Sequence, residues 1–295
     1  MLQGCYFTGV ESTPRISARE VSREVPLPSA DDFLLAGVSQ KPLSAWTPGK
    51  TFIITHPRVE RIFGASARAL GSSDPTGMII TFRDAGEVPS PTGSTVTDLN
   101  FLTPGGERLS YRVNRPLAKL LTDSITEVPF TIQLSAVAEA DSILRGRDFW
   151  TLTALWRDDD DTPVRGRKFV RVHIDSVAPG NELFPLKIAF TDDSGHSARL
   201  FIFPGAKGQA QRTFPQVFST TDPQLRYPHI SPEHWALIID SRIAEGMTTE
   251  ECRLALGAPK EVERGATNSF LREAWLYDNG VWLLFEDGLL KRFRR

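Results

Sequence analysis

The chain has 295 residues, a formal net charge of −2, 24% charged residues and 40% hydrophobic residues. Its length suits two or three domains that each bury a core of their own. The hydrophobic share excludes a disordered chain, and no stretch approaches the roughly 20 consecutive apolar residues that a membrane-spanning helix needs. A net charge near zero argues against a general nucleic-acid binder, because nothing draws the whole molecule to phosphates. Two cysteines exclude a disulfide scaffold.

The start of the chain carries a short motif, in which Leu2, Gln3 and Gly4 precede Cys5. This motif resembles the lipobox of bacterial lipoproteins, in which an apolar residue, a position that tolerates many residues and a small residue precede the cysteine. The resemblance implies that the Cys5 thiol carries a lipid, and that a signal peptide encoded upstream of Met1 is removed before this cysteine. With two or more acyl chains the anchor would be stable. The alternative is a chance match in an unremarkable tail.

Residues 1–30 are interpreted as this lipobox followed by a flexible tether, because the stretch contains several prolines and little periodicity. Tyr6, and not an aspartate, follows the cysteine. By resemblance to lipoprotein sorting rules, this favours the periplasmic side of an outer membrane. The expected partners are therefore the lipid bilayer, other envelope proteins and cell-wall components, and no nucleic acid.

The central part of the sequence is predicted to be all-β, with short β-branched or aromatic runs between turns rich in Pro, Gly and Asp. We predict two tandem small β-barrels over 31–125 and 126–205, and a polar surface linker over 206–232. One larger sandwich is the structural alternative. The predicted strands are 51–55, 78–83, 95–101, 108–113, 130–135, 148–156, 168–177, 186–192 and 198–203.

The two barrels are predicted from an internal similarity. Residues 47–55 are similar to 145–153, and residues 78–84 are similar to 186–192. A Gly-Lys or Gly-Arg pair before an aromatic strand, as in the first pair of stretches, resembles Src-homology-3-like barrels. The resemblance implies grooves lined by aromatic residues that bind peptides or cell-wall fragments. Three tryptophans are candidates for such a groove or for the core: Trp46, Trp150 and Trp156.

Helical periodicity begins near Pro232, and the first helix is predicted to end at Gly246. Thr248 and Glu251 have the spacing of a capping box, which predicts the start of a second helix that ends at Gly257. Asp-Asn-Gly and Glu-Asp-Gly, both strong hairpin-turn sequences, separate the strands that follow. These three strands are predicted over 274–277, 281–285 and 289–293.

Residues 233–295, two helices followed by an antiparallel meander, are similar to the SmpA/OmlA family of small outer-membrane lipoproteins, which have the BamE-like fold. The resemblance implies a two-layer ααβββ domain. It also implies a role in envelope assembly or in binding envelope proteins, without catalysis or cofactor. The matching residues are Ile243, Gly246-Met247-Thr248, Leu256-Gly257-Ala258-Pro259, Trp275-Leu276-Tyr277 and Leu284-Phe285-Glu286-Asp287-Gly288.

A search for catalytic or metal-binding motifs finds none. The five histidines lack metal-ligand spacing. Cys252 shares a predicted helix face with Ala255 and Leu256, which favours a core residue over a nucleophile. The four aspartates at 158–161 lack the spacing of a calcium loop, and a hairpin tip is predicted there. No catalytic, cofactor-binding or metal-binding residue is therefore predicted.

We thus expect a mostly β protein with a C-terminal α+β domain. Its expected function is that of a lipid-anchored, non-enzymatic envelope lipoprotein that acts as a protein-binding or assembly module. Two alternatives remain open at this point. One is a cell-wall hydrolase or peptidase whose catalytic groups meet only after folding, and the other is a soluble intracellular protein.

Overall fold

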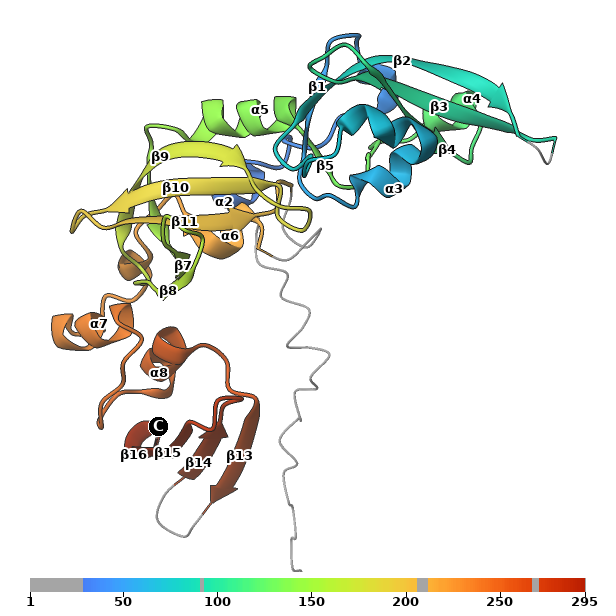
Figure 1. The fold of residues 1–295 in the computed structure, drawn as a ribbon. Coiled ribbons are helices and arrows are strands. Elements are labelled where there is room, and N and C mark those ends of the chain that lie inside the picture. Colours follow the sequence, from blue (N-terminus) through green and yellow to red (C-terminus); the bar gives the residue numbers. More distant parts are fainter. Residues whose placement is uncertain (1–28, 91–92, 206–211, 267–270, 295) are drawn as a thin grey trace, which may run out of the picture.

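The computed structural model describes residues 29–90, 93–205, 212–266 and 271–294 (Figure 1). The protein is mostly β, with 36% strand and 23% helix. The strands form three sheets in which the neighbouring strands pair antiparallel. Within the described ranges, no helix is both long and apolar enough to cross a membrane.

The first module, residues 43–133, contains a five-stranded sheet in the order β4-β3-β2-β1-β5. Its core is a cluster of aromatic rings in which Trp46 lies 4.8 Å from Phe52 and 5.1 Å from Phe82, between ring centroids. Edge-to-face contacts of this kind add to the burial of large apolar surfaces. The elements are η1 (Leu43–Ala45), β1 (Thr51–Ile54), α3 (Val59–Phe63), η2 (Gly64–Leu70), β2 (Ile79–Pro89), β3 (Thr95–Leu102), β4 (Arg108–Val113), α4 (Leu117–Leu120) and β5 (Thr131–Gln133).

The central module comprises residues 134–219 together with the short helix α2 (Ala30–Phe33). Its seven-stranded sheet has the order β12-β6-β9-β10-β11-β7-β8. Alternate residues of β10 are buried, as expected for a strand with one face on the core. The elements are α5 (Leu134–Leu144), β6 (Asp148–Thr151), β7 (Leu155–Arg157), β8 (Pro163–Arg165), β9 (Arg171–Pro179), β10 (Leu186–Asp192), β11 (Ser197–Ile202), α6 (Phe214–Val217) and β12 (Phe218–Ser219).

The prediction of two tandem β-barrels is wrong, because none of the sheets in the described part of the chain closes into a barrel. In the first and central sheets, three of the four edge strands are too short to close a ring: β5 and β8 have three residues each, and β12 has two. The chain also leaves β5 directly into the helix α5, which packs on the central sheet. Helices therefore cover the apolar face that barrel closure would otherwise bury.

The predicted internal repeat does not correspond to equivalent strand pairing. β1 pairs with β2 in the first module, as the repeat requires. The similar stretches of the central module form β6 and β10, which are both neighbours of β9 and not of each other. Trp46 and Trp156 belong to the two cores, and Trp150 is half-buried. The similarity reflects shared strand and turn composition and not a shared fold.

The segment predicted as a surface linker contributes to the core of the central module. Phe214 and Phe218 are fully buried, and their rings pack on Phe149 of β6. Thr220 donates its backbone N–H to the Asp31 carboxylate (2.8 Å), which attaches α2 to the same region. Polar residues and prolines suggested a linker, but a few buried aromatic side chains determine where the segment lies.

The C-terminal module, residues 223–294, has two helices that pack on one face of a four-stranded antiparallel sheet, β13-β14-β15-β16 (Figure 1). Two helices followed by an antiparallel meander are confirmed, but the meander has four strands and not three. The first strand is highly charged and exposed, so it has no hydrophobic signature. The elements are η3 (Pro223–Arg226), α7 (Pro232–Ile239), α8 (Thr249–Leu256), β13 (Glu261–Ala266), β14 (Leu271–Leu276), β15 (Trp282–Glu286) and β16 (Leu289–Arg294).

The boundaries of the two helices show which local signals were reliable. The capping box is confirmed: Glu251 donates its backbone N–H to Thr248 Oγ1 (3.2 Å), and the Thr248 N–H donates to Glu251 Oε2 (2.6 Å). The first helix is shorter than predicted and ends at Ile239. Ser241 adopts a left-handed conformation, with a φ of 53°, which ends the helical run well before Gly246.

Candidate binding pocket

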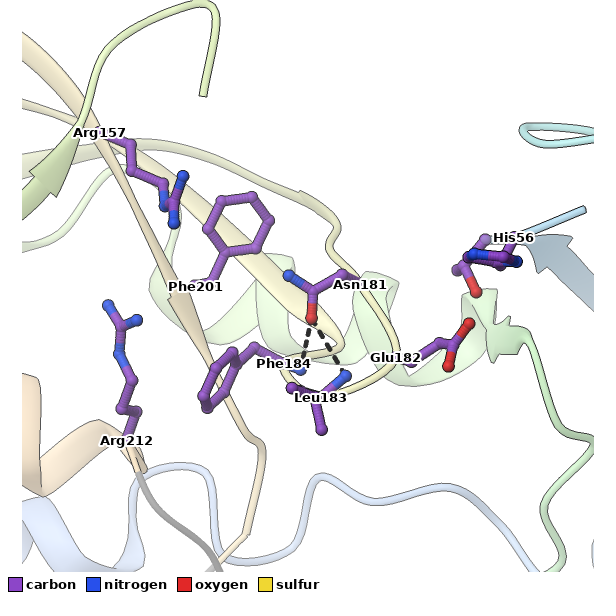
Figure 2. A pocket seen from close by; sticks show the side chains of 9 residues that line it. His56, Arg157, Asn181, Glu182, Leu183, Phe184, Phe201 and Arg212 are labelled. Carbon is purple, nitrogen blue, oxygen red and sulfur yellow. Dashed lines mark hydrogen bonds between the residues drawn. The ribbon is translucent and has the colours of Figure 1, made fainter. Parts of the chain in front are cut away.

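A pocket of about 430 Å³ lies where the first module meets the central module (Figure 2). Thr55 and His56, which follow β1, line it from the first module. Its volume lies within the usual range of ligand sites. The central module contributes Arg157, Asn181, Glu182, Leu183, Phe184, Phe201 and Arg212.

A tight loop between β9 and β10 forms one wall of the pocket. Asn181 Oδ1 accepts hydrogen bonds from the backbone N–H of Leu183 (3.0 Å) and of Phe184 (2.9 Å) (Figure 2). A Cβ at position 180 would lie 2.1 Å from the Phe184 carbonyl oxygen, so Gly180 is required for this turn. The turn leaves the Leu183 side chain 75% exposed at the pocket.

Phe201 of β11 lines the pocket, and two cationic side chains lie near its ring. The Arg157 guanidinium lies 5.7 Å from the ring centroid, and the Lys187 ammonium lies 5.8 Å from it. Lys187 forms an ion pair with Asp161 (3.3 Å), whereas Arg157 Nη1 donates to the backbone carbonyl of the same aspartate. The charge of Arg157 is therefore held in place, and it has no carboxylate partner among the described residues.

Arg212 also lines the pocket and lies near a different aromatic ring. Its guanidinium lies 5.1 Å from the centroid of the Phe184 ring. The side chain is half-buried, and burial, followed by the charge of Arg157, lowers the pKa of the guanidinium. No ion pair or side-chain hydrogen bond of Arg212 exists within the described ranges. Two arginines thus line one cavity, and neither has an ion-pair partner in the described part of the chain.

The far side of the pocket is neutral or acidic. Glu182 lies on the side of His56, away from the two arginines (Figure 2). His56 Nδ1 accepts the backbone N–H of Arg58 (3.0 Å), so this ring nitrogen is already engaged. The hydroxyl oxygen of Thr55 is buried and has no hydrogen-bond partner in the described part of the chain. The pocket therefore has a cationic end and an end with an unused polar atom.

The arrangement suits the binding of an anion. Arginines present several N–H donors in a fixed fork that matches a carboxylate, and aromatic rings beneath them restrict their motion. The described residues that line the pocket include no cysteine and no serine. A ligand with a carboxylate next to an apolar group would satisfy both the arginines and the Leu183 and Phe184 side chains.

Cys252 was predicted to be a core residue, and its position agrees with that prediction. It is fully buried in the core of the C-terminal module. Burial, followed by the charge of Glu251, raises the pKa of the thiol to about 12. Because the thiolate is the nucleophile, a thiol with this pKa is unreactive at neutral pH. The carboxylate of Glu251 also accepts from His234 (2.7 Å) and caps α8, which is a structural role.

The four aspartates form the tip of the β7–β8 hairpin, as predicted. Asp158 accepts backbone N–H groups from Asp160 and Thr162, and Asp161 adopts a left-handed conformation with a φ of 58°. Arg199 pairs with Asp159 (3.1 Å). In the ranges that the structure covers, no group of three or more metal-ligating side chains gathers at this tip or elsewhere.

No pattern in the sequence predicts this pocket. Arg157 and Arg212 are far apart in the chain and belong to no motif. They meet because β7 pairs with β11, and because Phe203, directly after β11, donates its backbone N–H to the Arg212 carbonyl (3.0 Å). Cys5, the predicted lipidation site, lies outside the described residues. Comparison with known proteins gives no match to a family model, a curated protein or a solved structure.

Proposed function

We propose that this protein is a non-enzymatic protein-binding module of the bacterial cell envelope, and that its pocket takes an acidic segment of a partner protein. The observation that carries the proposal is the half-buried guanidinium of Arg212. It lies on the Phe184 ring and has no ion-pair partner among the described residues. A desolvated charge without a counterion is costly, so a carboxylate that enters the pocket gains a strong interaction.

The charge distribution supports a short acidic segment rather than a polyanion. The whole chain has a net charge of −2, and Glu182 lines the same pocket. A nucleic acid or another long polyanion would meet this overall negative charge, whereas one or two carboxylates need only the local field of Arg157 and Arg212. The exposed Leu183 offers an apolar contact for a neighbouring side chain of the same segment.

The proposal can be tested with a fluorescein-labelled peptide that contains two adjacent aspartates between leucines. We expect the wild-type protein to bind it, and Arg212→Ala to weaken binding at least about tenfold, because one charge-assisted pair is lost. Arg212→Lys should lie between the two, since lysine retains the charge without the fork. Fluorescence anisotropy gives the affinities.

Two matched controls make this measurement specific. A peptide with asparagines in place of the aspartates should not bind, and Arg226→Ala, which removes an exposed arginine outside the pocket, should bind like the wild type. Equal affinity for the aspartate and asparagine peptides would contradict the proposal. Unchanged binding by Arg212→Ala would contradict it as well.

The proposal includes the location of the protein in the cell: a lipid on Cys5 would hold the modules at the periplasmic side of an outer membrane. The residues before Cys5, which resemble a lipobox, support this. Mass spectrometry of the product of the full gene, with its upstream codons, tests it. We expect a diacylglyceryl-modified and acylated Cys5 at the N-terminus, and an unmodified Cys5 that still follows Met1 would refute the anchor.

The C-terminal module is proposed to be a BamE-like domain. Helices α7 and α8 before an antiparallel meander, and the capping box at Thr248, support the assignment. The additional strand β13 is the main departure from the ααβββ order. Because fold does not determine the partner, this assignment adds an expected role in envelope assembly without naming what is bound.

A further inference from the structure

The sheet of the C-terminal module has one face that none of the described helices covers. Trp275, Leu283 and Phe285 point to the other face, where they pack with α7 and α8 in the core. Because successive side chains of a strand alternate between faces, their neighbours in sequence lie on the uncovered side. This outer face contains Trp282, half-buried, and Leu276, 38% exposed.

The strand register arranges the outer face in rows that run across the sheet, from β13 through β14 and β15 to β16. Two of these rows begin with a glutamate, continue with two apolar residues and end with an arginine, whereas a third row on the same face, Gly265, Arg272, Glu286 and Leu289, has an ion pair in its middle. The first row is Glu261, Leu276, Trp282 and Arg294, and the second row is Glu263, Ala274, Leu284 and Arg292. In these two rows one edge of the face is therefore acidic, the opposite edge is basic, and the middle is apolar.

The charges at the two edges cannot neutralise each other within one molecule. Three strand spacings of about 4.8 Å separate β13 from β16, so about 14 Å of apolar surface lies between them. Glu261, Glu263, Arg292 and Arg294 are all exposed, and none has an ion-pair or side-chain hydrogen-bond partner within 29–90, 93–205, 212–266 and 271–294.

Charged residues elsewhere on the same sheet do form pairs. Arg272 lies 3.8 Å from Glu286, and Arg264 lies 3.3 Å from Glu273. These pairs join residues of adjacent strands or of one hairpin. Among the described residues, the four edge charges form no such pairs, because the two glutamates both lie on β13 and the two arginines both lie on β16.

We propose that the outer face of this sheet binds the same face of a second copy of the chain. A twofold axis parallel to the strands, between β14 and β15, places β13 of one copy opposite β16 of the other. Glu261 then faces Arg294 of the partner subunit, and Leu276 faces the partner subunit's Trp282. A twofold axis across the strands would instead place glutamates on glutamates, so the charges select the first arrangement.

The dimer is expected to be weak and sensitive to salt. The four strands, three of six residues and one of five, present about 400 Å² from each copy, with strand spacings of about 4.8 Å and a rise of about 3.4 Å per residue. The total of about 800 Å² is below the roughly 1,200–2,000 Å² of stable complexes. Four exposed charge pairs across the interface give orientation and are screened as ionic strength rises.

Charge reversal tests the proposal directly in the full chain, by sedimentation velocity under reducing conditions that exclude a Cys5 disulfide. We expect the wild type to associate reversibly. Glu261→Lys with Glu263→Lys should weaken self-association at least about tenfold, and Arg292→Glu with Arg294→Glu should do the same, since each creates like-charge contacts at every pair. An equimolar mixture of the two double variants should dimerise again, because opposite charges then face each other.

A variant that carries all four reversals should self-associate like the wild type, which separates the charge pattern from any loss of folding. Glu245→Lys, an exposed change on the α7–α8 connection, is the matched control and should leave association unchanged. A wild type that remains monomeric at low salt overturns the proposal. It is also overturned if the double variants still dimerise, or if their mixture does not.

Discussion

The contacts that join the three modules differ in kind. Between the first and central modules, Ile132 of β5 is buried in the core of the central module, and Ile53 packs against the same core. Between the central and C-terminal modules, a loop of residues 165–169 donates hydrogen bonds to the ends of two helices and inserts a single aromatic ring. The first junction is continuous hydrophobic packing, whereas the second depends on a few directional contacts.

The loop at the second junction caps the C-terminal ends of both α7 and α8. Lys168 Nζ donates to the carbonyls of Leu254 (2.7 Å) and Ala255 (2.5 Å), and its backbone N–H donates to Ile239 (3.1 Å). Arg165 donates to the Asp240 carbonyl (2.7 Å). The last carbonyls of a helix lack partners within the helix and attract cations, so the two helices of one module are completed by another.

Phe169 supplies the apolar part of the second junction. Its ring lies 5.8 Å from the Trp235 ring, between centroids, in the core of the C-terminal module. The backbone of Phe169 has a φ of 57°, which bulky residues rarely adopt. Burial of the ring stabilises this conformation. Single substitutions can therefore weaken the second junction, whereas weakening the first requires repacking of a core.

Phe169→Ala should have the largest effect on the second junction. Loss of the buried ring is expected to destabilise the C-terminal module by about 3 kcal/mol, from lost burial and the cavity left behind. Urea denaturation followed by the fluorescence of the tryptophans should then show the C-terminal module unfolding first. Phe169→Leu, which retains most of the apolar contact, should cost about 1 kcal/mol. A single unchanged transition in Phe169→Ala would show that the junction does not depend on this ring.

Lys168→Met is expected to have a smaller effect, which depends on pH. At pH 7 the loss of two hydrogen bonds to helix carbonyls should cost about 1 kcal/mol. Burial, followed by the charge of Arg165, lowers the pKa of Lys168 from 10.5 to about 8. Between these values the unfolded chain binds more protons at this lysine than the folded chain does, so its contribution to the free energy of unfolding rises with pH.

The stability difference between the wild type and Lys168→Met should therefore widen as the pH rises from 8 towards 10.5. Cys252 and Tyr277, whose pKa values are both raised to about 12, oppose this trend in the wild type. They titrate equally in both proteins and cancel in the difference. Lys119→Met, an exposed change on α4, is the control. A difference that stays constant with pH would contradict the assigned cause.

The sequence predicted local features because their causes lie within a few residues. The capping box at Thr248, the hairpin tip at 158–161 and the core position of Cys252 are each decided by spacing and residue type. The strand β13 and the burial of Phe214 were missed, because an exposed strand has no hydrophobic period and a proline-rich segment has the composition of a linker.

The amino-acid order by itself determined that this chain is rich in β-strands and that two helices precede a meander near its C-terminus. Alternation, turn residues and caps act over short distances, so they are visible without a fold. Only the tertiary structure decided that the sheets stay open, that Arg157 and Arg212 share a pocket, and that the loop at 165–169 completes two distant helices. These outcomes depend on packing between segments far apart in the chain, where no local pattern records the partner.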